Sequence, residues 1–150
     1  MRPAYRVIAQ LIALGVVLQA AFVALGWFMT LSDIDGGQVV DKAFLDDEGW
    51  NIGLTLHGVV GMMVMPLLAL VLLIVSFFAK IPGGAKWAGI VFGLVVLQVA
   101  LGIFGHESAY IGLLHGLNAL ILFTAALGAG RRVATTTADV ARPTEDAAVR

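Results

Sequence analysis

Four long apolar runs alternate with short polar segments along this chain. The runs cover residues 7–29, 53–79, 87–105 and 110–130, and each is close to the ~20 residues that a helix needs to cross about 30 Å of hydrocarbon. Backbone groups inside lipid must pair with one another, so such runs form helices and not open strands. The pattern predicts an all-α membrane protein, with a four-transmembrane-helix bundle over residues 1–132 and a disordered polar tail over residues 133–150.

The composition supports a lipid environment. The chain is 60% hydrophobic and 13% charged, and its mean hydropathy is +0.97. Soluble domains are roughly 45–50% apolar and about 25% charged, so the lipid bilayer is the first expected partner. No basic run is present, which argues against a nucleic-acid partner. The chain has no cysteine, which excludes disulfides, thiolate metal sites and covalently attached c-type haem.

The distribution of Lys and Arg predicts the orientation of the helices. Eight of the nine basic residues lie at the helix ends that share a side with the N-terminus, and only Lys42 lies on the other side. Cytoplasmic segments carry the excess of Lys and Arg. Both termini are therefore expected in the cytoplasm, and the acidic segment over residues 30–52 is expected outside.

The chain contains two copies of one helix pair. The letters VVLQ end at Gln19 in the first run and at Gln98 in the third, and LHG surrounds His57 in the second run and His115 in the fourth. The matches come in the same order in both halves; the alternative is coincidence between apolar helices. Each half crosses the membrane twice, so the repeat predicts a pseudo-two-fold axis along the membrane normal.

His57 and His115 are expected inside the membrane at nearly the same depth. They follow the starts of their runs by four and five residues, which is roughly 6–8 Å at about 1.5 Å per residue. An ionisable side chain in lipid is costly and points toward a partner. One interpretation is that each histidine hydrogen-bonds to a neighbouring helix. The other is that the pair binds a cofactor across the bundle axis.

A b-type haem, one per chain, is the expected cofactor, with His57 and His115 as the two iron ligands. Neutral imidazole is a common ligand of iron, whereas a zinc or copper ion normally takes three or four protein ligands. Small residues after each histidine leave room for a porphyrin or, alternatively, for close helix packing. These residues are Gly58, Gly61, Gly116 and Ala119.

Other polar residues in and near the membrane have two interpretations each. Gln19 and Gln98 are related by the repeat, and they either bridge helices or hydrogen-bond to the bound group. Asn118 lies one turn after His115, and interhelical bonding is its expected role. His106, in the outer break, is expected to be an ordinary interfacial residue; a contact to a haem propionate or a surface metal is the alternative.

Two features concern the helices themselves. Pro66 lies inside the second run and is expected to kink that helix, because proline lacks the N–H of the helical hydrogen bond. Trp27, Trp50 and Trp87 lie near the ends of the runs, where tryptophan anchors a helix in the membrane interface.

The residues around the histidines resemble one half of the haem A synthase family. The resemblance rests on the His-Gly pair at residues 57–58, the Leu-Gln-x-x-Leu-Gly segment at 97–102, and His115 followed by Ala119. Proteins of that family resemble two four-helix bundles in tandem, each binding haem through a histidine pair. The resemblance covers residues 7–130 as a single bundle. It implies haem ligation by the two histidines, and it extends to small four-helix proteins of the bacterial cell (inner) membrane.

The chain also departs from that family. Gly58 stands where the family has an arginine, Leu54 stands where it has a glutamate, and a cysteine pair and the second bundle are absent. These departures argue against synthase chemistry, unless two chains pair as a homodimer.

The sequence therefore predicts a bis-histidine haem protein for electron transfer or haem handling. Its redox partner would be extracytoplasmic or a membrane quinol. Protein ligands on both sides of the iron leave no open position for a substrate, so no catalytic residue is assigned. The first alternative is a haem-modifying, synthase-like enzyme acting as a dimer. The second is a structural or assembly subunit of a membrane complex that binds no haem.

Overall fold

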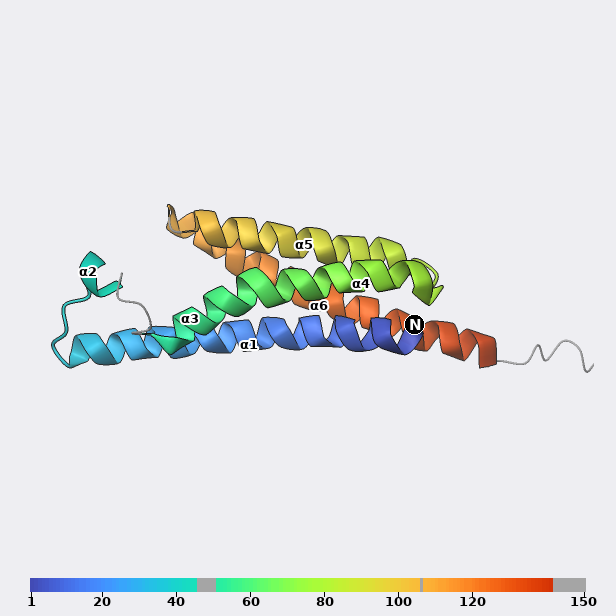
Figure 1. Cartoon of the computed structure of the whole chain (residues 1–150), viewed down its shortest axis with the longest axis horizontal. Coiled ribbons are helices and arrows are strands. Elements are labelled where there is room, and N and C mark those ends of the chain that lie inside the picture. The colour runs from blue at the N-terminus through green and yellow to red at the C-terminus, as the bar shows by residue number, and fades with distance from the viewer. Residues whose placement is uncertain (46–50, 106, 142–150) are drawn as a thin grey trace, which may run out of the picture.

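The computed structural model describes residues 1–45, 51–105 and 107–141, and it contains helices and no strand within those residues (Figure 1). One short helix, α2 (Lys42–Leu45), lies between the first two long ones. The long helical segments are α1 (Arg2–Asp35), the continuous unit α3 (Ile52–Val59), η1 (Val60–Val64) and α4 (Met65–Ala79), then α5 (Gly84–Phe104) and α6 (Ala109–Ala141).

All four long segments are long and apolar enough to cross a membrane, which confirms the expected four-transmembrane-helix protein. Large apolar side chains face outward along every segment, as a surface in contact with lipid requires. Those facing outward include Leu14, Val17, Phe77, Phe78, Val96, Leu113 and Leu120. The chain is thus a multi-pass membrane protein.

The helices extend beyond the apolar runs at several ends. The first helix spans Arg2–Asp35 and not only residues 7–29, because an apolar run marks the hydrocarbon-spanning part of a helix and not its ends. The last helix continues to Ala141, so residues 133–141 are helical where a disordered tail was expected. This segment contains three alanines, and alanine has the highest helix propensity. The rest of the expected tail lies outside the described residues.

The second membrane segment changes its winding just before Pro66. It is π-helical over Val60–Val64 and α-helical on both sides. A proline cannot donate to the carbonyl four residues earlier, and its ring clashes with that carbonyl. A π-helical turn shifts the hydrogen-bond register and accommodates this loss. The expected disturbance at Pro66 thus takes the form of a π-helical turn that begins three residues after His57.

The four segments form a ring in which each segment packs against two neighbours. Helix α1 lies against the α3–α4 segment and against α6, and α5 lies against α4 and α6. The α3–α4 segment and α6, which carry the two histidines, are therefore diagonal to each other. This is the arrangement that a pseudo-two-fold axis through the bundle predicts.

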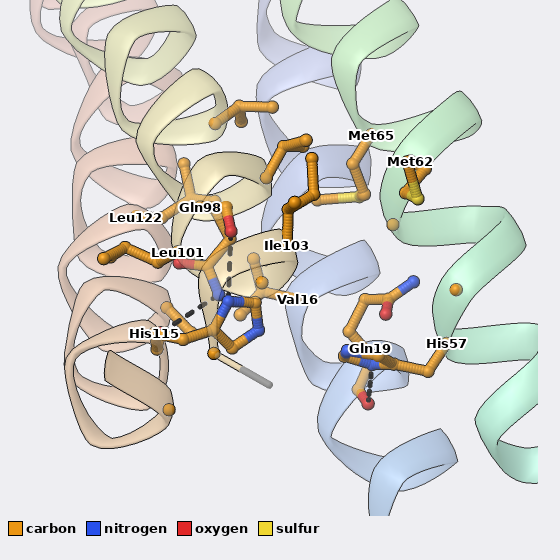
Figure 2. Close-up of a pocket in the computed structure, with 18 residues that line it drawn as sticks. Val16, Gln19, His57, Met62, Met65, Gln98, Leu101, Ile103, His115 and Leu122 are labelled. Atoms are coloured by element: carbon orange, nitrogen blue, oxygen red, sulfur yellow. Dashed lines mark hydrogen bonds between the residues drawn. The ribbon is translucent and has the colours of Figure 1, made fainter. Parts of the chain in front are cut away.

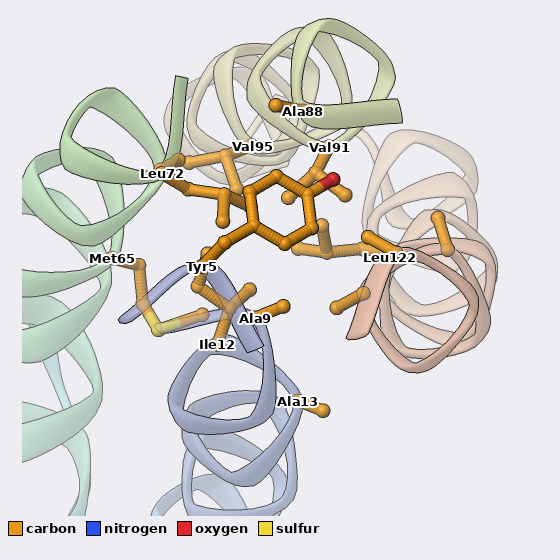
Figure 3. Packing of buried hydrophobic residues seen from close by; sticks show 14 of the residues in the cluster. Tyr5, Ala9, Ile12, Ala13, Met65, Leu72, Ala88, Val91, Val95 and Leu122 are labelled. Carbon is orange, nitrogen blue, oxygen red and sulfur yellow. The ribbon is translucent and has the colours of Figure 1, made fainter. Parts of the chain in front are cut away.

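Buried apolar side chains from all four long segments pack around Tyr5, near the N-terminus (Figure 3). The ring of Tyr5 lies among Leu72, Val91 and Leu122 from three other helices, and it is fully buried. Its hydroxyl donates a hydrogen bond to the Gly84 carbonyl oxygen at 3.0 Å, so burial leaves no unpaired polar group. Buried alanines bring the backbones close together, as is common between membrane helices. They are Ala9, Ala13, Ala69, Ala79, Ala88, Ala125, Ala126 and Ala129.

At the other end, α1 and α3 cross with their backbones in close contact. A Cβ atom added at Gly53 would lie 2.7 Å from the Gly26 Cα and the Phe22 carbonyl oxygen, so only glycine fits at that position. Next to the crossing, buried Asn51 caps α3 by accepting from the Leu54 N–H at 3.1 Å. The Asn51 side-chain amide also donates to the Gly26 carbonyl oxygen at 2.7 Å. The crossing therefore holds the start of α3, four residues before His57, against α1.

The tryptophans expected as interface anchors lie in different surroundings. Trp27 is exposed on α1, where lipid would surround it. Trp87 is partly buried, and the guanidinium carbon of Arg132 lies 4.8 Å from its ring centroid, a cation–π contact that joins α5 to α6. Trp50 lies outside the described residues.

Candidate functional site

The two intramembrane histidines meet in the interior of the bundle. His57 on α3 and His115 on α6 have ring centroids 6.0 Å apart, with an angle of 66° between the ring planes. Figure 2 shows the rings extending toward each other from opposite sides of a cavity. Two residues separated by 58 positions in the sequence thus form one pair, as their matched depth predicted.

On the second helix pair, His115 and Gln98 form two reciprocal hydrogen bonds. The His115 Nδ1 lies 3.0 Å from the Gln98 carbonyl oxygen. The Gln98 side-chain amide nitrogen donates in turn to the His115 carbonyl oxygen at 3.0 Å. A carbonyl oxygen only accepts, so Nδ1 carries the hydrogen and Nε2 keeps its lone pair. That tautomer leaves Nε2 available to bind a metal.

The first helix pair repeats this arrangement. The His57 Nδ1 lies 3.2 Å from the Gln19 carbonyl oxygen. The Gln19 amide satisfies its neighbours when its nitrogen lies 3.0 Å from the His57 carbonyl oxygen and its oxygen lies 3.0 Å from the Gly61 backbone nitrogen. Each glutamine thus lies between the two helices of its own pair, and its role toward a bound group stays a prediction.

A cavity of about 600 Å³ surrounds the two rings. This volume falls within the roughly 300–1,000 Å³ that is usual for small-molecule and cofactor pockets. The polar side chains on its wall are those of the two histidines and the two glutamines, and all other lining residues are apolar or glycine. An apolar wall with a few convergent polar groups is the usual composition of a ligand site in a protein.

Glycine forms much of the cavity wall. At Gly58 and Gly112, an added Cβ would meet no atom within 4 Å, so open space lies beside both backbones. At Gly102, it would lie 3.2 Å from the His115 Cε1, so this glycine lets the imidazole lie against α5. The glycines on the wall are Gly58, Gly61, Gly102, Gly105 and Gly112.

Seven of the eight residues assigned from sequence line this cavity, and the eighth does not. His57, His115, Gln19, Gln98, Gly58, Gly61 and Ala119 are on its wall. Gly116 is exposed and is not among the lining residues, although Gly58, which occupies the corresponding place after His57, is one of them.

Sequence reasoning missed Gly105 and Gly112 as wall residues. The internal repeat offered a signal for Gly105, because Gly105 follows Gln98 by seven residues just as Gly26 follows Gln19 in the first half.

The nearby methionines divide between two environments: Met62 and Met65 line the cavity, whereas Met63 is 68% exposed. His106 lies outside the described residues, so its expected interfacial role stays a prediction.

The described residues contain no group of three or more His, Asp, Glu or Cys side chains that could hold a metal ion by themselves. The two histidines would therefore supply only two ligands, and any further ligands would have to come from the bound group. The chain matches no protein-family model, and no curated protein or solved structure is significantly similar to it. The site must be interpreted from its own geometry.

Proposed function

We propose that this protein binds one b-type haem between His57 and His115 and uses it in electron transfer or haem handling. The observation that carries the proposal is the spacing of the two imidazoles across the cavity. Two imidazoles that bind one metal ion from opposite sides, each at about 2.0–2.1 Å with the nitrogen roughly 1.1 Å from its ring centroid, have centroids about 6 Å apart. The centroid distance in this bundle is 6.0 Å.

The same spacing also fits two rings in direct edge-to-face contact, since aromatic pairs have centroids about 4.5–7 Å apart. The cavity favours a cofactor over that interpretation. A direct contact between two imidazoles requires no free volume, whereas about 600 Å³ lies beside these rings. A bare metal ion requires little volume and more ligands than two. A porphyrin brings four nitrogens and fills an apolar space, so it suits both the ligand number and the cavity.

The residues of this chain would perform four tasks around the group. His57 and His115 would hold the iron, and the carbonyl oxygens of Gln19 and Gln98 would orient the two rings. Glycines at Gly58 and Gly112 would leave room beside the ligands. The apolar wall would keep water away from the group. When bound, haem iron supplies a one-electron redox couple whose potential depends on its axial ligands and their surroundings.

The resemblance to one half of the haem A synthase family agrees with this proposal for the ligand pair. His57 and His115 would both hold the iron, so we propose no catalytic residue. The partner class follows from location: the histidines lie in the half of the bundle remote from the termini, so a redox partner outside the cytoplasm or a membrane quinol would be nearest.

We further propose that the protein resides in a bacterial cell membrane with both termini in the cytoplasm. The support is the excess of Lys and Arg at the helix ends near the termini. The chain has no cysteine, so single cysteines can report the topology. In intact cells, a membrane-impermeant maleimide should label Gln38→Cys and should not label Ala85→Cys until the membrane is broken. The reverse pattern would contradict the orientation.

The test of the haem proposal is the reduced-minus-oxidised absorption spectrum of the detergent-purified protein, with His57→Ala and His115→Ala beside it. The wild type should show sharp low-spin cytochrome bands with about one haem per chain. Each variant should lose the haem or become high-spin, because one of the two residues that would hold the iron is gone. Helix content, measured by circular dichroism, should stay unchanged in both variants.

The alternatives predict different results. If the wild-type protein stays colourless after reconstitution with haem, the proposal is wrong, and a structural or assembly subunit becomes the better account. If the purified protein converts a side chain of bound haem, as followed by mass spectrometry of the extracted haem, the synthase-like enzyme is favoured instead.

A further inference from the structure

Helices α1 and α5, which are related by the internal repeat, bury residues at the same positions. Both helices have buried residues 14, 10 and 7 positions before their repeat-related glutamines. These residues are Tyr5, Ala9 and Ile12 before Gln19, and Gly84, Ala88 and Val91 before Gln98. No residue has therefore been gained or lost between these positions in one helix relative to the other.

The α3–α4 segment and α6, which carry the histidines, match in this way only after one residue is removed. Buried residues follow the histidine by 7, 11 and 14 positions in α6, and by 8, 12 and 15 positions in the α3–α4 segment. They are Leu122, Ala126 and Ala129 after His115, and Met65, Ala69 and Leu72 after His57. The α3–α4 segment thus contains one extra residue between its histidine and its buried face.

The extra residue lies between two pairs of matching cavity residues. Gly61 and Ala119 each follow their histidine by four positions, and both line the cavity. Met65 and Leu122, the first fully matching core residues, line it as well. Three residues separate Gly61 from Met65, whereas two separate Ala119 from Leu122. The extra residue therefore lies within the π-helical segment η1.

Exposure identifies the extra residue as Met62. Met63 is 68% exposed, close to the 65% of Leu120. Val64 and Ile121, the next residues, are also both exposed. Met62 lines the cavity, whereas Leu120 and Ile121 do not (Figure 2). Met62 is thus the residue that has no equivalent in α6.

A continuous α-helix could not turn both His57 and the core residues of α4 inward. At 3.6 residues per turn, eight residues would place Met65 about 80° around the helix from His57. Seven residues place Leu122 only about 20° from His115, and α6 is α-helical throughout. In η1 the Met65 N–H donates to the Val60 carbonyl oxygen, five residues earlier instead of four. Such a turn takes up one extra residue and keeps the two flanking α-helices in phase.

We propose that the π-helical turn positions His57, because it takes up an inserted residue and so lets the imidazole face His115 while α4 keeps its buried face. Pro66 alone does not require this turn, since a proline can instead kink an α-helix. The inference rests on the proposed haem site for its purpose. The facing of the two side chains is nevertheless a property of the protein without haem.

The first experiment is made on the haem-free protein in detergent. Because the chain has no cysteine, His57→Cys/His115→Cys contains only two thiols, which a short bis-maleimide joins when both side chains face the cavity. Deletion of Met63 gives the same chain as deletion of Met62 and leaves the seven-residue spacing of α6. A regular α-helix then has the correct phase, so this variant should cross-link to the same extent as its parent.

Deletion of Leu120 is the matched control, because it removes a similarly exposed residue from the corresponding place in α6. Six residues then separate position 115 from the buried face of α6. We expect about tenfold less intramolecular cross-link, because position 115 would point about 120° away from that face. Circular dichroism and gel filtration establish that the variants are folded.

The second experiment makes the same two deletions in the wild-type chain and measures haem content and absorption spectra after reconstitution. The Met63 deletion should keep low-spin bands with about one haem per chain, because both histidines still face the cavity. The Leu120 deletion should lose the haem or become high-spin. A difference between the two deletions cannot come from a general effect of shortening a membrane helix.

The outcomes separate this inference from the haem proposal. A folded Met63 deletion that no longer cross-links overturns the inference, and so does a Leu120 deletion that cross-links as well as the parent. If the Met63 deletion does not fold because Pro66 then interrupts a regular α-helix, the same deletion combined with Pro66→Ala takes its place. Cross-linking as expected together with a colourless wild type would contradict the haem proposal alone.

Discussion

Replacing Gly58 by leucine should abolish haem binding and leave the bundle folded. Gly58 lies on the cavity wall next to His57, and a Cβ added there meets no atom within 4 Å. A leucine side chain can therefore extend into the cavity without displacing protein atoms, and it would occupy the volume that a porphyrin needs. Gly112 offers the same opportunity from the α5–α6 side, so the double variant Gly58→Leu/Gly112→Leu should fill the cavity from both helix pairs.

The measurement is the haem-to-protein ratio after reconstitution, with the thermal melt of the haem-free protein as the test of folding. We expect a ratio near one for the wild type and near zero for both Gly58→Leu and the double variant, with similar melting temperatures of the haem-free proteins. Gly93→Leu on α5 is the matched control, because Gly93 also has no neighbour within 4 Å but does not line the cavity. Full haem content in the double variant would place the haem elsewhere and contradict the proposed site.

Replacing Gly53 by alanine should strongly destabilise the protein. The added Cβ would lie 2.7 Å from two backbone atoms of α1, and backbone atoms cannot turn aside as a flexible side chain can. Overpacking typically costs about 1–3 kcal/mol, and we expect roughly 3 kcal/mol for this contact because both helices would have to separate. Their separation would also break the hydrogen bond from Asn51 to the Gly26 carbonyl oxygen.

The free energy of unfolding should be measured in mixed detergent micelles with increasing denaturing detergent. Gly89→Ala on α5 provides the same chemical change at an exposed helical position with no neighbour within 4 Å. Because alanine has a higher helix propensity than glycine, this control should be neutral or slightly stabilising. If Gly53→Ala and Gly89→Ala have equal free energies of unfolding, the close crossing of α1 and α3 does not stabilise the fold.

Some of the site could be predicted because it depends on depth and not on rotation. The position of a residue along an apolar run fixes its depth in the membrane, since each helical residue advances about 1.5 Å. The internal repeat then places His57 and His115 on diagonal helices. These two facts were sufficient to bring the histidines together, and the 6.0 Å between their rings agrees with them.

The remaining features depend on how each helix is rotated about its axis and how close its neighbours lie. Gly116 is adjacent to His115 in the sequence but is not on the cavity wall. The contact of Gly26 with Gly53 requires two helices to cross at one point, and no local pattern states where that point is. The π-helical turn at Val60–Val64 likewise had no specific signal besides Pro66.

By itself, the sequence determined that the chain crosses the membrane four times as helices and that two related halves carry one histidine each. It did so because the transfer of each run into lipid depends on its own composition and length. Only the tertiary structure decided that a cavity surrounds the histidines and that Asn118 and Gln98 hydrogen-bond beside it. Those features arise from packing and hydrogen bonds between helices, and the same apolar runs would satisfy the membrane in many other rotations.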